Sequence, residues 1–266
     1  MSQRTKYLAL LFVLLLPIQS IAAIDKPVNV PAGKVLSLDL CTDWILAKHA
    51  DPSQVLALSP LTKQYPVNWV GLDWPTHDGS LEQILELKPD LVITGEYNAL
   101  MLRRRLQELG VRVEILPLPK TLSQINDYEQ RLLSLIGQSK DKASKPPQLK
   151  SFSNSKQKLL LLGANGIGTG RNTFENDLLQ YTGWDNYLLD KGYINLDLEQ
   201  IATNPPNAIL WSAPASAALS NLFAKHPVLK QAIPANQWLV TDAWNWQCPG
   251  PWTWDLIDQL QTSAQR

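Results

Sequence analysis

Short apolar runs alternate with amphipathic segments along most of the chain. Runs rich in leucine and β-branched residues predict strands at residues 34–39, 54–59, 90–95, 112–117, 158–163, 207–212 and 237–242. Apolar residues at helical spacing predict helices at residues 80–88, 98–109, 173–181, 217–229 and 252–260. This alternation predicts an α/β protein with mostly parallel sheets that are covered by helices on both faces.

A short internal repeat divides the chain into two halves. The tetrapeptide Leu-Glu-Gln-Ile at positions 81–84 recurs at 198–201, and a proline follows each copy at the same offset, Pro89 and Pro206. Both copies lead from a short helix into an apolar strand. Four identical residues alone prove little, but the shared context of helix, proline and strand favours two lobes of similar architecture.

The domain organisation follows from these patterns. We expect a signal peptide at 1–23, an N-terminal α/β lobe at 24–137, an inter-lobe connection at 138–157 and a C-terminal α/β lobe at 158–266. The connection is rich in serine, lysine and proline, which predicts a solvated segment. Because residues 122–136 before it have a helical pattern, we expect a helical and extended link between the lobes, with a ligand cleft between them.

The N-terminus has the layout of a secretory signal peptide. Arg4 and Lys6 precede the apolar run 8–16, and small residues follow at 20–23. That run is shorter than the roughly 20 residues that a membrane-spanning helix needs. No cysteine follows the cleavage region to carry a lipid anchor. We therefore expect an exported, soluble protein, free in the periplasm if the source is a Gram-negative bacterium.

Charge and composition narrow the classes of function. Lys plus Arg and Asp plus Glu both total 24, and this balance argues against a nucleic-acid partner or an anionic membrane surface. The chain has 10 tryptophans and 19 prolines. Indole side chains supply large contact areas, so we expect several tryptophans on a binding surface. We expect a monomer.

An enzyme is the less favoured interpretation. The glycine-rich segment 163–170 lies between a predicted strand and a predicted helix, which is the setting of a dinucleotide-binding motif. Its spacing departs from G-x-G-x-x-G, and no arrangement of catalytic side chains follows from the spacing of the other residues. An exported nucleotide-dependent oxidoreductase is thus a distant alternative, and we expect no cofactor.

The chain resembles the periplasmic solute-binding proteins of the cobalamin and ferric-siderophore ABC importers. The resemblance is carried by segments 35–43, 79–92, 109–113 and 240–251, and it covers essentially the whole mature chain. Its most specific part is the helix, Lys88-Pro89-Asp90 and strand of the second segment. Members of the family usually join their lobes by a long rigid helix, whereas here the helical pattern of 122–136 runs into a proline-containing connection.

The resemblance implies ligand capture without chemistry, followed by delivery to an ABC permease with its ATPase. The implied ligand is a metal chelate, with a corrinoid such as cobalamin as the first choice and a ferric siderophore or haem as the alternative. It also implies that Glu82 and Glu199, one on each lobe, dock into the permease. Without the resemblance, both would be ordinary first-turn glutamates favoured by the helix dipole.

Candidate ligand-binding residues lie in the loops that follow the predicted strands, since ligands of open α/β sheets bind beyond the carboxyl ends of the strands. These candidates are Asp39, Cys41, Trp69, Trp74, His77, Tyr97, Arg171, Trp211, Trp244 and Trp246. Aromatic faces suit a large planar or macrocyclic ligand, and Arg171 would suit an anionic group. For each tryptophan taken singly, a position in the core is equally compatible with the sequence.

Cys41 and Cys248 are the two cysteines of the chain. In an oxidising compartment such a pair predicts a disulfide, which here would tie the two lobes together. The alternatives are two separate buried thiols, or a soft metal bound by both thiols and His77. The three histidines form no close-spaced zinc motif, so we expect no metal site.

Overall fold

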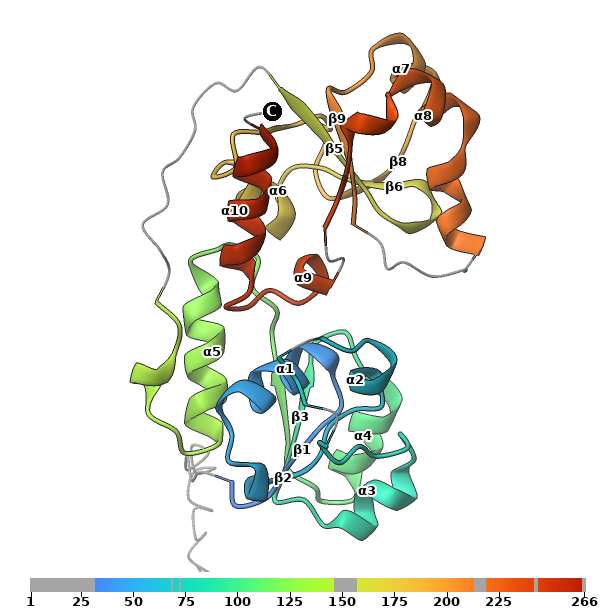
Figure 1. Cartoon of the computed structure of the whole chain (residues 1–266). Coiled ribbons are helices and arrows are strands. Elements are labelled where there is room, and N and C mark those ends of the chain that lie inside the picture. The colour runs from blue at the N-terminus through green and yellow to red at the C-terminus, as the bar shows by residue number, and fades with distance from the viewer. Residues whose placement is uncertain are drawn as a thin grey trace, which may run out of the picture.

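Two sheets with their surrounding helices form two lobes, one above the other in Figure 1. The computed structural model describes residues 32–67, 69–71, 73–145, 157–212, 219–241 and 244–264. The predicted α/β class with two lobes is confirmed. The predicted signal peptide at 1–23 lies outside the described residues, as does the part of the predicted connection from 146 to 156.

The first lobe is built on a parallel four-stranded sheet in the order β2-β1-β3-β4. Its strands are β1 (Val35–Ser37), β2 (Val55–Ala57), β3 (Leu91–Gly95) and β4 (Val113–Leu116). The helices are α1 (Leu40–His49), α2 (Leu61–Gln64), α3 (Leu81–Leu87) and α4 (Leu100–Glu108), with a 3₁₀ turn at Pro52–Gln54. Alternate strand residues enter different cores, because successive side chains of a strand point to opposite faces.

The second lobe contains a six-stranded sheet in the order β10-β9-β5-β6-β8, with β7 paired to β5. Strands β5 (Lys158–Leu162), β7 (Asp185–Asn186), β9 (Ala208–Trp211) and β10 (Trp238–Val240) pair with one another in parallel. Strand β6 (Ile167–Thr169) pairs antiparallel with β5, and strand β8 (Tyr193–Asn195) pairs antiparallel with β6. The helices are α6 (Phe174–Leu179), α7 (Leu198–Thr203), α8 (Pro227–Ala232), α9 (Trp244–Gln247) and α10 (Thr253–Ala264).

The predicted helix at 217–229 is not one continuous α-helix over its described part. Residues Leu219–Lys225 form a 3₁₀ helix, and α8 begins only at Pro227. His226 caps α8 through its side chain, which accepts a hydrogen bond from the Val228 amide. Proline lacks the N–H group of a helix interior and disfavours helical backbone in the residue before it, so the helix starts anew at this point.

Helix α5 (Gln124–Leu135) links the lobes. Ile125 near its start packs in a core of the second lobe, whereas Leu132 packs in a core of the first. Polar contacts also hold α5 and the residues just before it to both lobes. The Leu122 amide donates to Asp177 of α6 at 2.8 Å, and Glu129 contacts the ring of His49 on α1 at 2.5 Å. This 12-residue helix thus belongs to the cores of both lobes.

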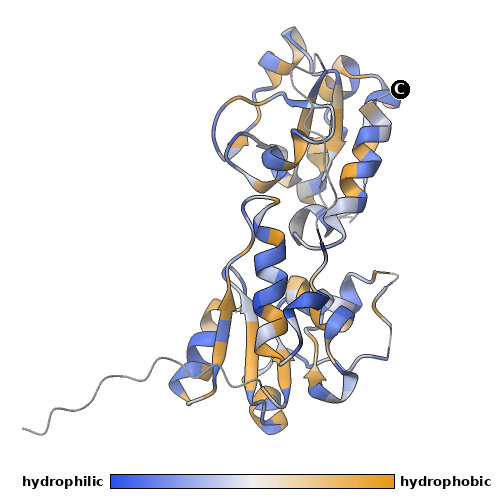
Figure 2. Ribbon diagram, turned by 90° about the vertical axis from the view of Figure 1, so that its left-hand side faces the viewer, coloured by the Kyte–Doolittle hydropathy of each residue, from blue (hydrophilic) through white to orange (hydrophobic). Residues whose placement is uncertain are grey.

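The apolar residues gather along the strands and on the inward sides of the helices (Figure 2). In the first lobe, the buried side chains on one face of the sheet surround Trp44 of α1, and those on the other face surround Ile84 of α3. Burial of these faces is the main driving force for such a fold. Within the described ranges, no helix is long and apolar enough to cross a membrane.

Candidate ligand site

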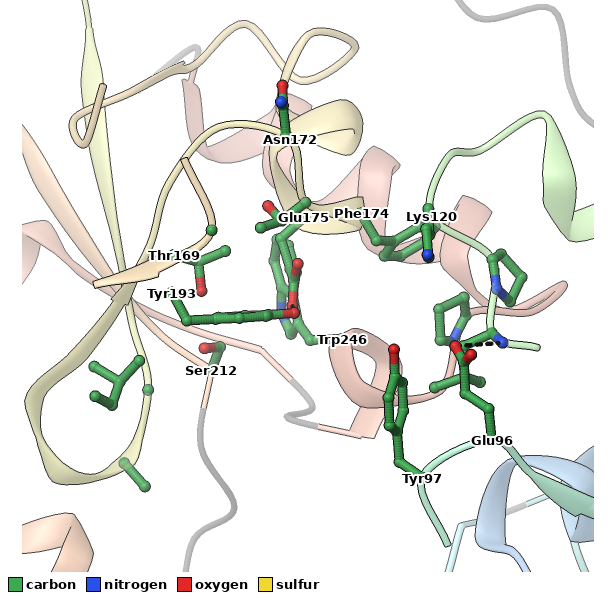
Figure 3. A pocket seen from close by; sticks show the side chains of 18 residues that line it. Glu96, Tyr97, Lys120, Thr169, Asn172, Phe174, Glu175, Tyr193, Ser212 and Trp246 are labelled. Atoms are coloured by element: carbon green, nitrogen blue, oxygen red, sulfur yellow. Dashed lines mark hydrogen bonds between the residues drawn. The ribbon is translucent and has the colours of Figure 1, made fainter. Parts of the chain in front are cut away.

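A pocket with a volume of about 580 Å³ lies between the two lobes (Figure 3). This volume falls in the range of small-molecule sites, roughly 300–1,000 Å³. The lining residues are Glu96, Tyr97, Leu118, Pro119, Lys120, Gly163, Ala164, Ile167, Thr169, Asn172, Thr173, Phe174, Glu175, Gly192, Tyr193, Ser212, Trp246 and Pro249. Both lobes therefore contribute to one cavity.

The pocket lies beyond the carboxyl ends of parallel strands from both sheets. Glu96 follows β3, Leu118 comes shortly after β4, Gly163 follows β5 and Ser212 follows β9. Ligands of open α/β sheets bind at this end of the strands, because the loops there converge. The topology of each lobe thus places its loops around the same space.

Aromatic side chains from both lobes face the pocket. Tyr97 of the first lobe is 67% exposed, and Tyr193 of β8 in the second is 68% exposed. Figure 3 shows Tyr97 reaching toward the second lobe, with the ring of Tyr193 lying across the wall on the other side. Trp246 of α9 is buried beneath, where its Nε1 donates to the Thr241 hydroxyl at 2.7 Å. Such rings offer stacking surfaces at a small cost in side-chain entropy.

Glu175 and Tyr193 form a polar pair on the second-lobe wall. Thr173 caps α6 by accepting a hydrogen bond from the Asn176 amide at 3.2 Å, which fixes the first turn that carries Glu175. The Tyr193 hydroxyl donates to Glu175 Oε1 at 3.4 Å. Burial raises the pKa of the Glu175 carboxyl, and desolvation together with the Glu175 charge raises the pKa of Tyr193 to about 12. Tyr193 is therefore a neutral hydrogen-bond donor at physiological pH.

On the first-lobe wall, Glu96 is held by the backbone and its loop is held by Arg103. The Glu96 Oε1 accepts a hydrogen bond from the Leu118 amide at 3.3 Å. Arg103 Nη1 donates to the carbonyl oxygens of Gly95 and Glu96, at 3.0 and 2.9 Å. These bonds keep the loop after β3 next to the segment between β4 and α5, which carries Lys120. This wall of the pocket is therefore formed without a ligand.

Of the ten ligand-binding residues predicted from the sequence, the pocket brings together Tyr97 and Trp246. Asp39 lies buried at the start of α1, where Oδ1 accepts hydrogen bonds from the amides of Cys41 and Thr42 at 2.6 and 3.2 Å. Its Oδ2 accepts from the Gly95 amide and the Asn98 side chain. The carboxylate is thus engaged in joining β1, α1 and β3, and its part in ligand binding stays a prediction.

His77 is buried and both of its ring nitrogens are engaged. Nε2 lies 2.8 Å from the carbonyl oxygen of Ser37, to which it donates, and Nδ1 accepts from the Gly79 amide at 2.9 Å. Burial lowers the pKa of the ring, which favours its neutral form. Among the described residues, no group of three or more His, Cys, Asp or Glu side chains is placed to hold a metal ion.

A disulfide joins Cys41 of α1 to Cys248, which follows α9, as the cysteine count predicts. The soft-metal alternative required both thiols to be free and is contradicted by this bond. Beside it, the buried ring of Trp44 makes edge contacts with Trp69 and Trp252, at centroid distances of 5.3 and 5.1 Å. Trp69, 40% exposed, stacks on Trp252 at 5.6 Å. These contacts anchor the segment after α9 in the first lobe.

Four further residues were predicted to bind the ligand. Three of them do not line the pocket, and the side chain of the fourth lies outside the part of the chain that the structure describes. Trp74 packs against the core around Trp44, and Trp211 of β9 packs against a core of the second lobe. Arg171 is exposed, and its backbone pairs with Lys191. Trp244 begins α9, but the position of its side chain lies outside the described part. A role of these four residues in ligand binding stays a prediction.

The glycine-rich segment forms a turn and then an inner strand of the second sheet, between β5 and β8. After β5 the chain makes a 3₁₀ turn at Ala164–Gly166 and returns as β6, antiparallel to β5. A Cβ atom at Gly170 would lie 2.1 Å from the carbonyl oxygen of Asp190, so the close approach of these two backbones requires glycine. A dinucleotide-binding motif needs a helix directly after the strand. This segment therefore lacks the setting on which the oxidoreductase alternative rested.

Glu82 and Glu199 occupy equivalent places on the two lobes. Each is the second residue of its helix, α3 or α7, and each is exposed. The caps are Ser80, which accepts from the Gln83 amide, and Asp197, which accepts from the amides of Glu199 and Gln200. Figure 1 shows α3 on the first lobe and α7 on the second. The repeat in the sequence thus presents one first-turn acid on each lobe.

Comparisons with solved structures identify the fold. No protein-family model matches the chain, and no curated protein matches it in sequence. A periplasmic haem-binding protein from Pseudomonas aeruginosa matches with a TM-score of 0.65 and 20% identity over 87% of this chain and 92% of that one. The periplasmic vitamin B12 binding protein of Vibrio cholerae matches with a TM-score of 0.61 and 21% identity, over 88% and 97%.

A protein from Staphylococcus epidermidis, described as a possible iron-binding (periplasmic solute-binding) protein, gives a TM-score of 0.65 and 16% identity over 89% of this chain and 98% of that one. These matches extend over both lobes. At such identities the likeness concerns the fold, which is the two-lobed fold of periplasmic binding proteins.

Proposed function

We propose that this chain is the periplasmic substrate-binding component of an ABC importer and performs no chemistry itself. The observation that carries the proposal is the pocket of about 580 Å³ between the lobes, lined by loops from both. A site divided between two lobes suits capture and release of a small molecule. The fold shared with haem- and vitamin-B12-binding proteins supports the same function.

The ligand in this proposal is a metal chelate, with a corrinoid such as cobalamin as the first choice. Tyr97, Phe174, Tyr193 and Trp246 supply aromatic surface for a large ring system. Among the residues that line the pocket, Lys120 is the one cation, beside the carboxylates of Glu96 and Glu175. A strongly anionic ferric chelate would call for several cations. A corrinoid is largely uncharged at its rim, so it suits this wall better than a ferric siderophore or haem.

Delivery to the permease is assigned to Glu82 and Glu199. Both are exposed, and no ion pair to either is present in the part of the chain that the structure describes. An acid on each lobe allows one binding protein to contact two permease subunits at once, with basic pockets as the complementary surface.

Titration of the purified mature protein, followed by tryptophan fluorescence and corrected for ligand absorption, tests the ligand. Saturable one-to-one binding of cobalamin or cobinamide is the expected result. Tight binding of haem or a ferric siderophore instead would keep the transport role and replace the ligand.

A further inference from the structure

Glu175 carries a buried carboxylate oxygen without a hydrogen-bond partner. Its Oε1 accepts from the Tyr193 hydroxyl at 3.4 Å, whereas Oε2 is buried and has no partner among the described residues. A carboxylate oxygen removed from water without a hydrogen bond is destabilising. Because Glu175 is part of the pocket wall, as Figure 3 shows, a bound molecule is the natural source of the missing donor.

The pocket contains a second carboxylate in a different situation. Glu96 on the first-lobe wall already accepts a hydrogen bond from the Leu118 amide at 3.3 Å. The cation of the wall, Lys120, makes no salt bridge with either glutamate in the described ranges. Glu175 is therefore the carboxylate of the pocket whose acceptor is left for a ligand, and it has no salt bridge within the part of the chain that the structure describes.

We propose that Glu175, oriented by Tyr193, is a specificity-determining residue that accepts a hydrogen bond from an N–H group of the ligand and disfavours carboxylates at that position. This inference rests on the proposed function, since it assigns one contact within the same pocket. An amide or ammonium group donates to Oε2, whereas a carboxylate brings a second negative charge and no donor. The class of ligand is thus a chelate with amide groups on its rim.

Two corrinoids that differ in their side chains test this contact. Cobinamide carries amides, and cobyrinic acid carries carboxylic acids at the corresponding positions. Both are titrated at a pH of about 8, which favours the ionised form of Glu175, against wild type, Glu175→Gln and the matched control Glu86→Gln, an exposed carboxylate of α3 that does not line the pocket. The wild type is expected to prefer cobinamide by about tenfold or more, since bonds to charged groups are the stronger ones.

In Glu175→Gln the preference is expected to fall several-fold, because the amide of glutamine donates to a carboxylate, while Glu86→Gln leaves it unchanged. Tyr193→Phe keeps the ring and removes the hydroxyl, so it is expected to reduce the preference, and Tyr181→Phe, which does not line the pocket, is its control. Equal binding of both corrinoids by the wild type, or the same change in Glu175→Gln and Glu86→Gln, overturns the role of Glu175 and leaves the proposed function intact. Failure of the wild type to bind either corrinoid overturns the corrinoid assignment, and the assigned contact with it.

Discussion

Cys41 and Cys248 are bonded to each other across 207 residues of sequence, with their Cα atoms 5.0 Å apart. Cys41 lies in the first turn of α1, and Cys248 follows α9, downstream of the last strand of the second lobe. Trp252, a few residues later, is buried against Trp44 of α1. The C-terminal part of the chain thus returns to the first lobe before it forms α10.

The first prediction concerns this bond. Replacing both cysteines, Cys41→Ser with Cys248→Ser, is expected to lower the free energy of unfolding by roughly 2–5 kcal/mol, because the closed loop is long. Urea unfolding without reductant measures the loss. Reductant should shift the wild-type midpoint toward that of the variant and leave the variant unchanged. Equal midpoints of wild type and variant without reductant would show that the bond contributes nothing.

The second prediction concerns α5 as a shared element of two cores. Ile125→Ala removes contacts in the second lobe and Leu132→Ala removes contacts in the first. Each is expected to cost about 2–5 kcal/mol, and each variant should still unfold in one transition that fluorescence and circular dichroism report alike. Arg131→Ala, exposed on the same helix, is the control. Two separate transitions would mean that the lobes unfold independently.

The third prediction concerns Asp43 of α1, which is buried and accepts hydrogen bonds from the hydroxyls of Ser59 and Thr62 at 2.5 and 2.6 Å. Burial raises the pKa of this carboxyl from 3.8 to about 7. The folded state therefore holds the proton more tightly than the unfolded state, and the stability gained is fully present below about pH 4 and lost as the pH rises to about 7.

Replacing Asp43 by Asn should remove this contribution, which amounts to at most about 4 kcal/mol. The check is the difference in melting temperature between wild type and Asp43→Asn, followed from pH 4 to pH 8. It should shift in favour of the variant as the pH rises. The same series with Asp258→Asn, an exposed carboxylate of α10, should show no such trend. A constant difference for Asp43→Asn would contradict the raised pKa.

The fourth prediction concerns transport. The double charge reversal Glu82→Arg with Glu199→Arg should abolish uptake by cells that express the cognate permease, because the proposed docking places both acids against basic surface. Ligand affinity should stay within about twofold, since neither residue lines the pocket. Glu86→Arg with Gln200→Arg changes neighbouring exposed positions and should leave most of the uptake. Lost ligand binding in the first pair would instead point to misfolding.

The lobes were predictable because their parallel strands are short apolar runs, such as Leu91–Gly95, followed by turn residues and amphipathic helices. Strands β6 and β8 escaped prediction. Each has three residues, and β6 contains a glycine that the alternation rule does not assign to a strand. The 3₁₀ segment before Pro227 has helical spacing, but Pro227 lacks the backbone N–H group that a continuous helix would need at that position.

The pocket was predictable in its place and in two of its residues. The rule on carboxyl ends of strands led to Tyr97, and the aromatic stretch near the C-terminus led to Trp246. Glu175 and Tyr193 were missed because 18 residues separate them in sequence, and it is the pairing of β6 with β8 that brings the two together. Tyr193, the first residue of β8, gave one local signal, a large aromatic residue directly after Gly192 in a polar segment.

The central claim, that the space between the lobes binds the ligand, is tested most directly by calorimetric titration of cyanocobalamin into a double pocket variant. Tyr97→Ala with Tyr193→Ala removes one exposed ring from each lobe, and Met101→Ala with Leu189→Ala removes exposed apolar side chains of the two lobes away from the pocket. One-to-one binding is expected for the wild type and for the Met101→Ala, Leu189→Ala control. In the tyrosine variant, the affinity for cyanocobalamin is expected to be weaker by about tenfold or more. Unchanged affinity in the tyrosine variant, or no binding by the wild type, would contradict the central claim.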